Sequence, residues 1–233
     1  LKLHAYRLLM DEPFFAALSR KVEKRASTAI PTAGVMVNPD TAQFEMIYNP
    51  EFFASLPEEQ VRGVLKHEFY HLIFEHVTSR KPEGVPHMAW NVAADLAINS
   101  HLVGELPEMA CMPGVGPFAD LPKGESAEWY LANLPQKDET EGGEGGESSE
   151  SGGEPGEPGE GEPGSFDDHS GWSEDGDSPA QEAANQMAKQ RLKEALKEAA
   201  SEAAGAAKGW GTVSAAVKKD IIKRLETKVD WKK

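Results

Sequence analysis

The stretch SLPEEQVRGVLKHEFYHLIFEHV, residues 55–77, carries the strongest local signals in the chain and predicts a long amphipathic helix. Ser55 and Glu58 have the spacing of a capping box, and Pro57 suits the first turn, where an N–H is not needed. Apolar residues recur at helical spacing and predict the face turned toward the core: Val61, Val64, Leu65, Leu72 and Ile73. We therefore expect the rest of the fold to pack around this helix.

The same helix carries the motif His67-Glu68-Phe69-Tyr70-His71, an H-E-x-x-H sequence. Two histidines four residues apart project from one face of a helix, so both imidazoles can reach one Zn²⁺ ion. Glu68 lies about 100° around the helix from His67, close enough to contact a water at the ion without binding the ion itself. The motif therefore predicts a zinc site at His67 and His71, with Glu68 as the catalytic base.

A zinc site of this kind needs a third protein ligand and an open position for water. The next predicted helix offers Asn91, Asp95 and Asn99, which repeat every four residues and therefore share one face. We predict that Asp95 is the third ligand and that the two asparagines are orienting hydrogen-bond partners. The alternatives are that Asp95 instead holds a ligand histidine through its Nδ1–H, or that His87 or His101 completes the site.

Three further residues are weaker candidates for the site. His76 follows His71 by five residues, which corresponds to about 140° on a helix, so we expect it to face away from the metal in a structural or surface role. His169 lies in the segment DDHSGW and is expected to be solvated, with a regulatory metal contact as the alternative. Cys111 lies in a predicted loop and is expected to be inert.

The segments around the motif predict a mixed α+β fold. Residues 3–24 read as a helix, and the β-rich runs at 34–38 and 44–49 are joined by a Pro-Asp-Thr turn, which predicts a hairpin. Further helices are expected at three places: 88–103, 180–208 and 213–225. We expect the last two helices to pack on the N-terminal region.

The acid excess of the chain is concentrated in one segment. The formal net charge is −15, from 39 acidic and 24 basic residues, and residues 138–177 contain 15 acidic residues but no Lys or Arg. This segment is rich in Gly, Glu, Ser and Pro, which bury too little apolar surface to offset chain entropy. We therefore divide the chain into a core at 1–136, a disordered acidic insertion at 137–179 and a helical segment at 180–233.

Composition also argues against several classes of protein. Outside the acidic segment, acidic and basic residues are equal in number, so no basic excess predicts a nucleic-acid partner. No apolar run approaches the roughly 18 residues of a membrane span, and no secretory signal stands at the start. The single cysteine cannot form an internal disulfide, which is consistent with a reducing compartment.

Four segments resemble one bacterial family: TAGVMVN (32–38), FEMIYNPEFFASLPEEQVRGVLKHEFYHLIFEH (44–76), WNVAADLAIN (90–99) and ESAEWYLANL (125–134). This is the family of metallopeptidase-type domains that precede a von Willebrand A-like domain, and the tail at 209–233 resembles the end of such a domain. The resemblance covers roughly residues 1–134 and 205–231, and makes the acidic stretch a variable insertion. It implies a zincin-like fold, with a small sheet over the active-site helix, and a cytosolic protein encoded near a MoxR-type AAA+ ATPase.

Together these features predict a cytoplasmic zinc-dependent metallopeptidase that acts on a peptide or protein substrate. In a zincin-like fold, the strand at 44–49 would border the cleft and pair with an extended peptide. Tyr48, Tyr70 or His101 would stabilise the oxyanion, with burial of Tyr70 as the alternative. Two other functions stay open: a non-catalytic, zinc-stabilised interaction module that works with a AAA+ ATPase, and a latent protease covered by residues 138–177.

Overall fold

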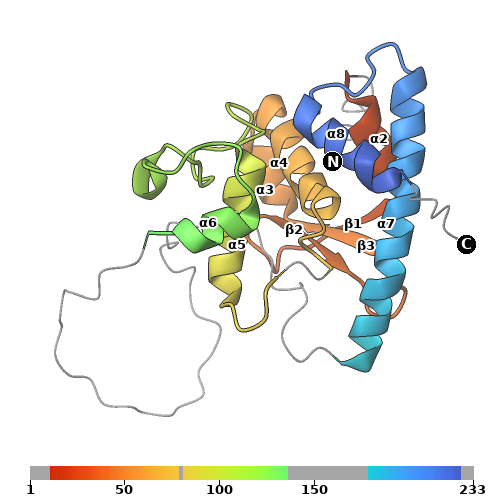
Figure 1. Cartoon of the computed structure of the whole chain (residues 1–233), viewed down its shortest axis with the longest axis horizontal. Helices are drawn as coiled ribbons and strands as arrows, with labels where there is room; N and C mark the ends of the chain where they lie inside the picture. Colours follow the sequence, from red (N-terminus) through yellow and green to blue (C-terminus); the bar gives the residue numbers. More distant parts are fainter. Residues whose placement is uncertain (1–10, 79–80, 136–177, 227–233) are drawn as a thin grey trace, which may run out of the picture.

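The computed structural model describes residues 11–78, 81–135 and 178–226 (Figure 1). These residues form an α+β fold in which a small sheet crosses the molecule, with helices above it and on both sides of it in this view. The strands are β1 (Val22–Ala26), β2 (Ala33–Val37) and β3 (Phe44–Tyr48). The helices are α2 (Pro13–Ser19), α3 (Pro50–Ser55), α4 (Glu58–Ile73), α5 (His87–Asn99), the short 3-10 helix η1 (Gly116–Phe118), α6 (Ala127–Asn133), α7 (Pro179–Gly205) and α8 (Ala215–Leu225).

The sheet has the strand order β1-β3-β2, so β3 is its central strand. β2 and β3 pair antiparallel, with Ala33 opposite Tyr48, which confirms the predicted hairpin. β1 pairs parallel with β3, with Val22 opposite Phe44. The prediction that the strand at 44–49 accepts an extended peptide is therefore wrong, because neighbouring strands occupy both of its edges.

The N-terminal helix predicted at 3–24 is only partly correct, and residues 3–10 lie outside the described part of the chain. α2 ends at Ser19, and Val22–Ala26 forms β1 instead of continuing the helix. Glu, Lys and Ala favour a helix locally, but this segment gains parallel pairing with β3. A contact between distant segments has overridden the local preference.

The predicted capping of the motif helix is wrong, because a separate short helix, α3, ends at Ser55 and α4 begins only at Glu58. Asn49 caps α3, since its side chain accepts a hydrogen bond from the N–H of Glu51 at 2.9 Å. Ser55 is the last residue of α3, and its hydroxyl donates to the carbonyl of Phe52 at 2.7 Å. The expected capping box therefore does not form, and Pro57 is the N-cap of α4.

α4 and α5 lie at the centre of the core, and α4 also packs against β2 and α2. Every residue of α5 from Trp90 to Asn99 is buried, including Asn91, Asp95 and Asn99. A helix that is covered on all sides must accommodate its polar groups inside the protein, and buried polar groups are costly unless they are paired. The polar face of α5 is therefore turned toward other protein groups and not toward bulk water.

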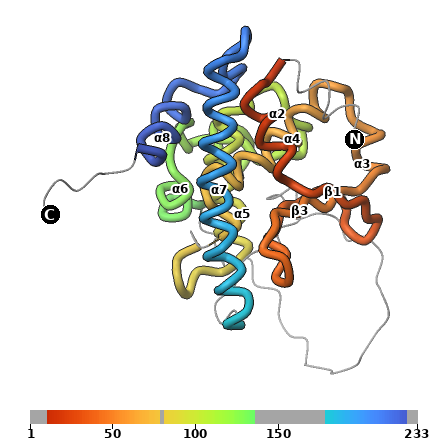
Figure 2. The backbone as a smooth tube through the Cα atoms, turned by 90° about the vertical axis from the view of Figure 1, so that its right-hand side faces the viewer, coloured from red at the N-terminus to blue at the C-terminus, as the bar shows by residue number. Residues whose placement is uncertain are grey.

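The long helix α7 runs along one side of the molecule and packs against α2 (Figure 2). Arg191 donates two hydrogen bonds to the β2–β3 turn, at 2.6 Å to the carbonyl of Thr41 and 2.7 Å to that of Ala42. Val217 and Ile221 of α8 are buried. These contacts confirm that the two C-terminal helices form and pack on the N-terminal region.

No helix in the described part of the chain has the length and apolarity needed to cross a membrane. The acidic segment, with His169 and its neighbours Phe166 and Trp172, lies outside the described residues apart from its last two positions. The predictions of a disordered insertion and of a covering loop therefore stay predictions.

Candidate metal centre

Two buried helices bring together three side chains that can bind a metal ion. The Nε2 atoms of His67 and His71, one turn apart on α4, lie 2.8 Å from each other. Oδ1 of Asp95, on α5, lies 3.6 Å from the His67 Nε2 and 3.4 Å from the His71 Nε2. One donor atom from each side chain therefore points to a common centre, and all three residues are fully buried.

The third position in this cluster is taken by Asp95. Among the described residues, the group of converging donors that contains both motif histidines does not include His87 or His101. Asp95 approaches the Nε2 atoms, whereas the Nδ1 atoms of the two rings meet Asn99 and His76. This arrangement places the Asp95 carboxylate among the converging donors and not behind a histidine.

Asn99 contacts the His67 ring, as predicted from its position on the same face of α5 as Asp95. Its Oδ1 lies 2.8 Å from the Nδ1 of His67, and its Nδ2 donates to the carbonyl of Cys111 at 2.7 Å. The carbonyl of Cys111 thus fixes which end of the amide faces the imidazole. Asn91 has no such role in the described part of the chain, where its buried side-chain oxygen has no hydrogen-bond partner.

The prediction that His76 faces away from the centre is wrong. His76 is only 2% exposed, and its Nδ1 lies 3.2 Å from the Nδ1 of His71. The 140° estimate assumed a continuous helix, but α4 ends at Ile73 and the chain then turns back. The end of the helix therefore determines where His76 lies.

Glu68 is fully buried on α4, beside His67 in the sequence. It is not one of the three residues whose donor atoms converge. This separation from the donor set is what the motif predicts for a base that does not bind the ion. Its catalytic role stays a prediction.

Tyr70 lies in the hydrophobic core, which agrees with the alternative that it is buried. Its ring meets Phe15 edge-on at 5.3 Å between centroids and stacks on His101 at 5.6 Å. Burial raises the pKa of Tyr70 above its ordinary value, and burial lowers the pKa of His101. Tyr48 packs edge-on against Phe53, and its role in oxyanion binding stays a prediction.

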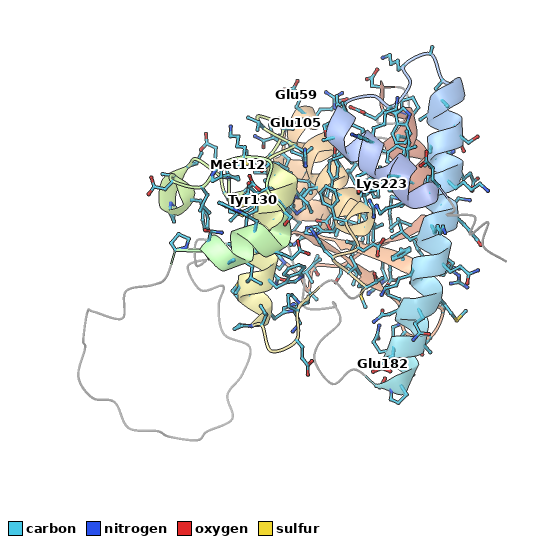
Figure 3. All side chains as sticks on the ribbon, viewed as in Figure 1. Glu59, Glu105, Met112, Tyr130, Glu182 and Lys223 are labelled. Carbon is cyan, nitrogen blue, oxygen red and sulfur yellow. The ribbon has the colours of Figure 1, made fainter. Side chains whose placement is uncertain are left out.

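A buried ion-pair network anchors the helix next to the motif, and sequence reasoning missed it. Lys66 is 2% exposed, pairs with Glu105 and Glu12, and donates to the hydroxyl of Thr212 at 2.9 Å. Glu105, the partner of Lys66, is labelled in Figure 3. The sequence offers one signal for this network, a lysine directly beside the first motif histidine.

The fold and the cluster define an α+β protein with a candidate three-donor metal centre on an H-E-x-x-H helix. The chain belongs to the family described as "Putative metallopeptidase domain", whose family model matches residues 2–233. An uncharacterized protein of Thermotoga maritima is 30% identical over 70 residues, a match that covers 30% of this chain and 17% of that protein. No solved structure matches the chain.

Proposed function

We propose that this protein is a zinc-dependent metallopeptidase that hydrolyses peptide bonds at the centre formed by His67, His71 and Asp95. The observation that carries the proposal is the convergence of two imidazole Nε2 atoms from the H-E-x-x-H helix α4 with one carboxylate oxygen from α5. Membership of the metallopeptidase-type family supports the same chemistry. A zincin-like fold is part of the proposal, supported by the small sheet packed beside the motif helix.

The donor set fits Zn²⁺. Ligand atoms of a tetrahedral zinc site lie about 3.3 Å apart, given metal–ligand bonds of about 2.0–2.1 Å. The three distances here are 2.8, 3.4 and 3.6 Å. The buried carboxylates of Glu68 and Asp95 would also be costly as charges without a nearby cation. Two histidines and one carboxylate leave a fourth position for water or substrate, as catalytic zinc sites require.

Each residue would have a defined part in the reaction. The ion would supply Lewis acidity, which polarises the scissile carbonyl and acidifies the attacking water. The Glu68 carboxylate would accept the proton of that water and pass it to the nitrogen of the leaving amine. Asn99 would hold the Nδ1–H of His67, so that the Nε2 lone pair of that ring stays directed at the centre.

The proposal is tested first by metal content and then by cleavage. Elemental mass spectrometry of chelator-washed, zinc-reloaded protein should find about one zinc per chain, with zinc lost from His67→Ala and Asp95→Ala. The zinc-loaded protein is then incubated with a library of proteome-derived peptides, with cleavage read by mass spectrometry. Glu68→Gln is the matched control, because it should keep zinc and lose cleavage. No zinc in the wild type, or equal cleavage by Glu68→Gln, would overturn the proposal.

A peptide or protein substrate, a cytoplasmic location and a MoxR-type AAA+ ATPase partner are further parts of the proposal and derive from the resemblance. The competing function is a non-catalytic, zinc-stabilised module that binds the ATPase. Pull-down with the ATPase distinguishes the two functions. Binding that is unaffected by His67→Ala, together with no cleavage by the wild type, would favour the module.

A further inference from the structure

The turn that ends α4 carries His76 back to the metal centre. Phe74 caps the helix, and Glu75 has a φ of 62°, in the left-handed region that a non-glycine residue seldom adopts. The N–H of His76 then donates to the carbonyl of His71 at 3.0 Å. This reversal places the two histidine side chains next to each other, although a continuous helix would separate them.

The position of the His76 ring is set by aromatic packing. The ring meets Trp90 of α5 nearly edge-on, with 5.7 Å between centroids, and it lies 5.7 Å from the ring of Phe74. At 2% exposure the imidazole has little room to move. Its Nδ1 is therefore held 3.2 Å from the Nδ1 of His71, within hydrogen-bonding distance.

We propose that His76 is a positioning residue, whose Nδ1 accepts the Nδ1–H of His71 and so directs the His71 Nε2 lone pair at the metal. A neutral imidazole carries one N–H, and a ring that binds a metal through Nε2 must carry its hydrogen on Nδ1. That hydrogen needs an acceptor in this buried site. His67 has Asn99 for this purpose, and His71 has His76. His76 consequently carries its own hydrogen on Nε2.

The turn that presents His76 is held from the C-terminal part of the chain. Arg224 of α8 donates to the carbonyl of Ile73 at 2.8 Å and to a carboxylate oxygen of Glu75 at 3.2 Å. The first contact satisfies a carbonyl at the end of α4, where no further helical turn supplies a donor. The second restrains the residue in the left-handed conformation. α8 thereby supports the geometry on which the His76–His71 contact depends.

The inference rests on the proposed zinc site, but zinc affinity tests it without any substrate. His76→Phe keeps a ring of similar size and removes the acceptor, so it should weaken zinc binding about 10- to 100-fold in a chelator-competition assay. His76→Asn places a carbonyl oxygen near the original Nδ1 and should recover most of the affinity. His101→Phe is the matched control, since it makes the same change in a ring that stacks on Tyr70 and lies near Phe74, and it should leave zinc affinity unchanged.

The tautomer of His76 gives a second readout that needs no variant. In ¹⁵N NMR spectra of the zinc-loaded wild type, His76 should carry its hydrogen on Nε2 and show Nδ1 as a hydrogen-bond acceptor. A hydrogen on Nδ1 of His76, or equal zinc affinity of the wild type and His76→Phe, would overturn the inference alone. Absence of zinc binding by the wild type would overturn the proposed function and the inference together.

Discussion

Replacing Gly63 with alanine should destabilise the protein, although Gly→Ala within a helix is ordinarily favourable by up to about 1 kcal/mol. Gly63 lies on α4, one turn before His67. A Cβ added there would lie 1.9 Å from the carbonyl oxygen of Glu105 and 2.6 Å from its carbonyl carbon. Non-bonded heavy atoms normally keep about 3.5 Å apart, so one backbone must move by more than about 1 Å.

The backbone at Glu105 cannot move freely. Its N–H donates to the carbonyl of Leu102 at 3.0 Å, and its side chain pairs with Lys66. Overpacking typically costs about 1–3 kcal/mol, and weakening the Lys66 pair adds to that cost. After the gain of up to about 1 kcal/mol from the higher helix propensity of alanine is subtracted, we expect a net loss of about 2 kcal/mol in the free energy of unfolding. This loss corresponds to a fall of roughly 4–8 °C in Tm for a chain of this size.

Urea unfolding of Gly63→Ala beside the wild type and Gly205→Ala measures this effect. Gly205 is the last residue of α7, and a Cβ added there meets nothing within 4 Å. The same substitution should therefore leave stability unchanged or raise it slightly at Gly205. If Gly63→Ala proves as stable as the wild type, the close approach of Glu105 to α4 does not restrict this position and the reasoning fails.

Three further predictions concern Lys66, Asn99 and Lys24. Lys66→Met should lower the free energy of unfolding by about 3 kcal/mol in urea titrations, because it leaves the buried carboxylate of Glu12 without its cation. A loss below about 0.5 kcal/mol would contradict this. Asn99→Leu should weaken zinc binding about 10- to 100-fold in chelator competition. Asn99→Asp keeps an acceptor for His67 and should weaken zinc binding less. Equal losses of zinc affinity in the two variants would refute the orienting role of Asn99. Burial lowers the pKa of Lys24 from 10.5 to about 8. The unfolded chain therefore binds more protons than the folded chain between about pH 8 and 10.5. The free energy of unfolding of the wild type should rise with pH across that window, relative to that of Lys24→Met. Parallel curves of stability against pH for the two proteins would count against this prediction.

Much of the candidate site could be predicted because its signals are local. The four-residue spacing of His67 and His71 places both on one face of any helix, and the spacing of Asp95 and Asn99 does the same for α5. The structure brings Asp95 to the two Nε2 atoms and Asn99 to a Nδ1 atom, as these spacings suggested. The presence of the hairpin and the C-terminal helices was also predictable from short-range patterns.

One error arose where a contact between distant segments outweighed a local preference, and another where one local signal outweighed a second one. Val22–Ala26 has a helix-compatible composition, but it pairs with β3 and thereby makes β3 a central strand. Ser55 has the spacing of a capping residue, yet the preceding Asn49-Pro50 pair starts a separate short helix that ends there. The pairing of β1 depends on a segment about twenty residues away, whereas the cap at Asn49 is a local signal that competes with the one at Ser55.

By itself, the sequence determined the identity of the metal-binding candidates, because helical periodicity alone sets which side chains share a face. Only the tertiary structure decided what surrounds them. The left-handed turn at Glu75 brings His76 to His71, and Lys66 meets Glu105 and Thr212 across large sequence separations. Such contacts depend on where a helix ends and on which segments pack against it. Those features follow from the burial of the whole chain and not from the spacing of neighbouring residues.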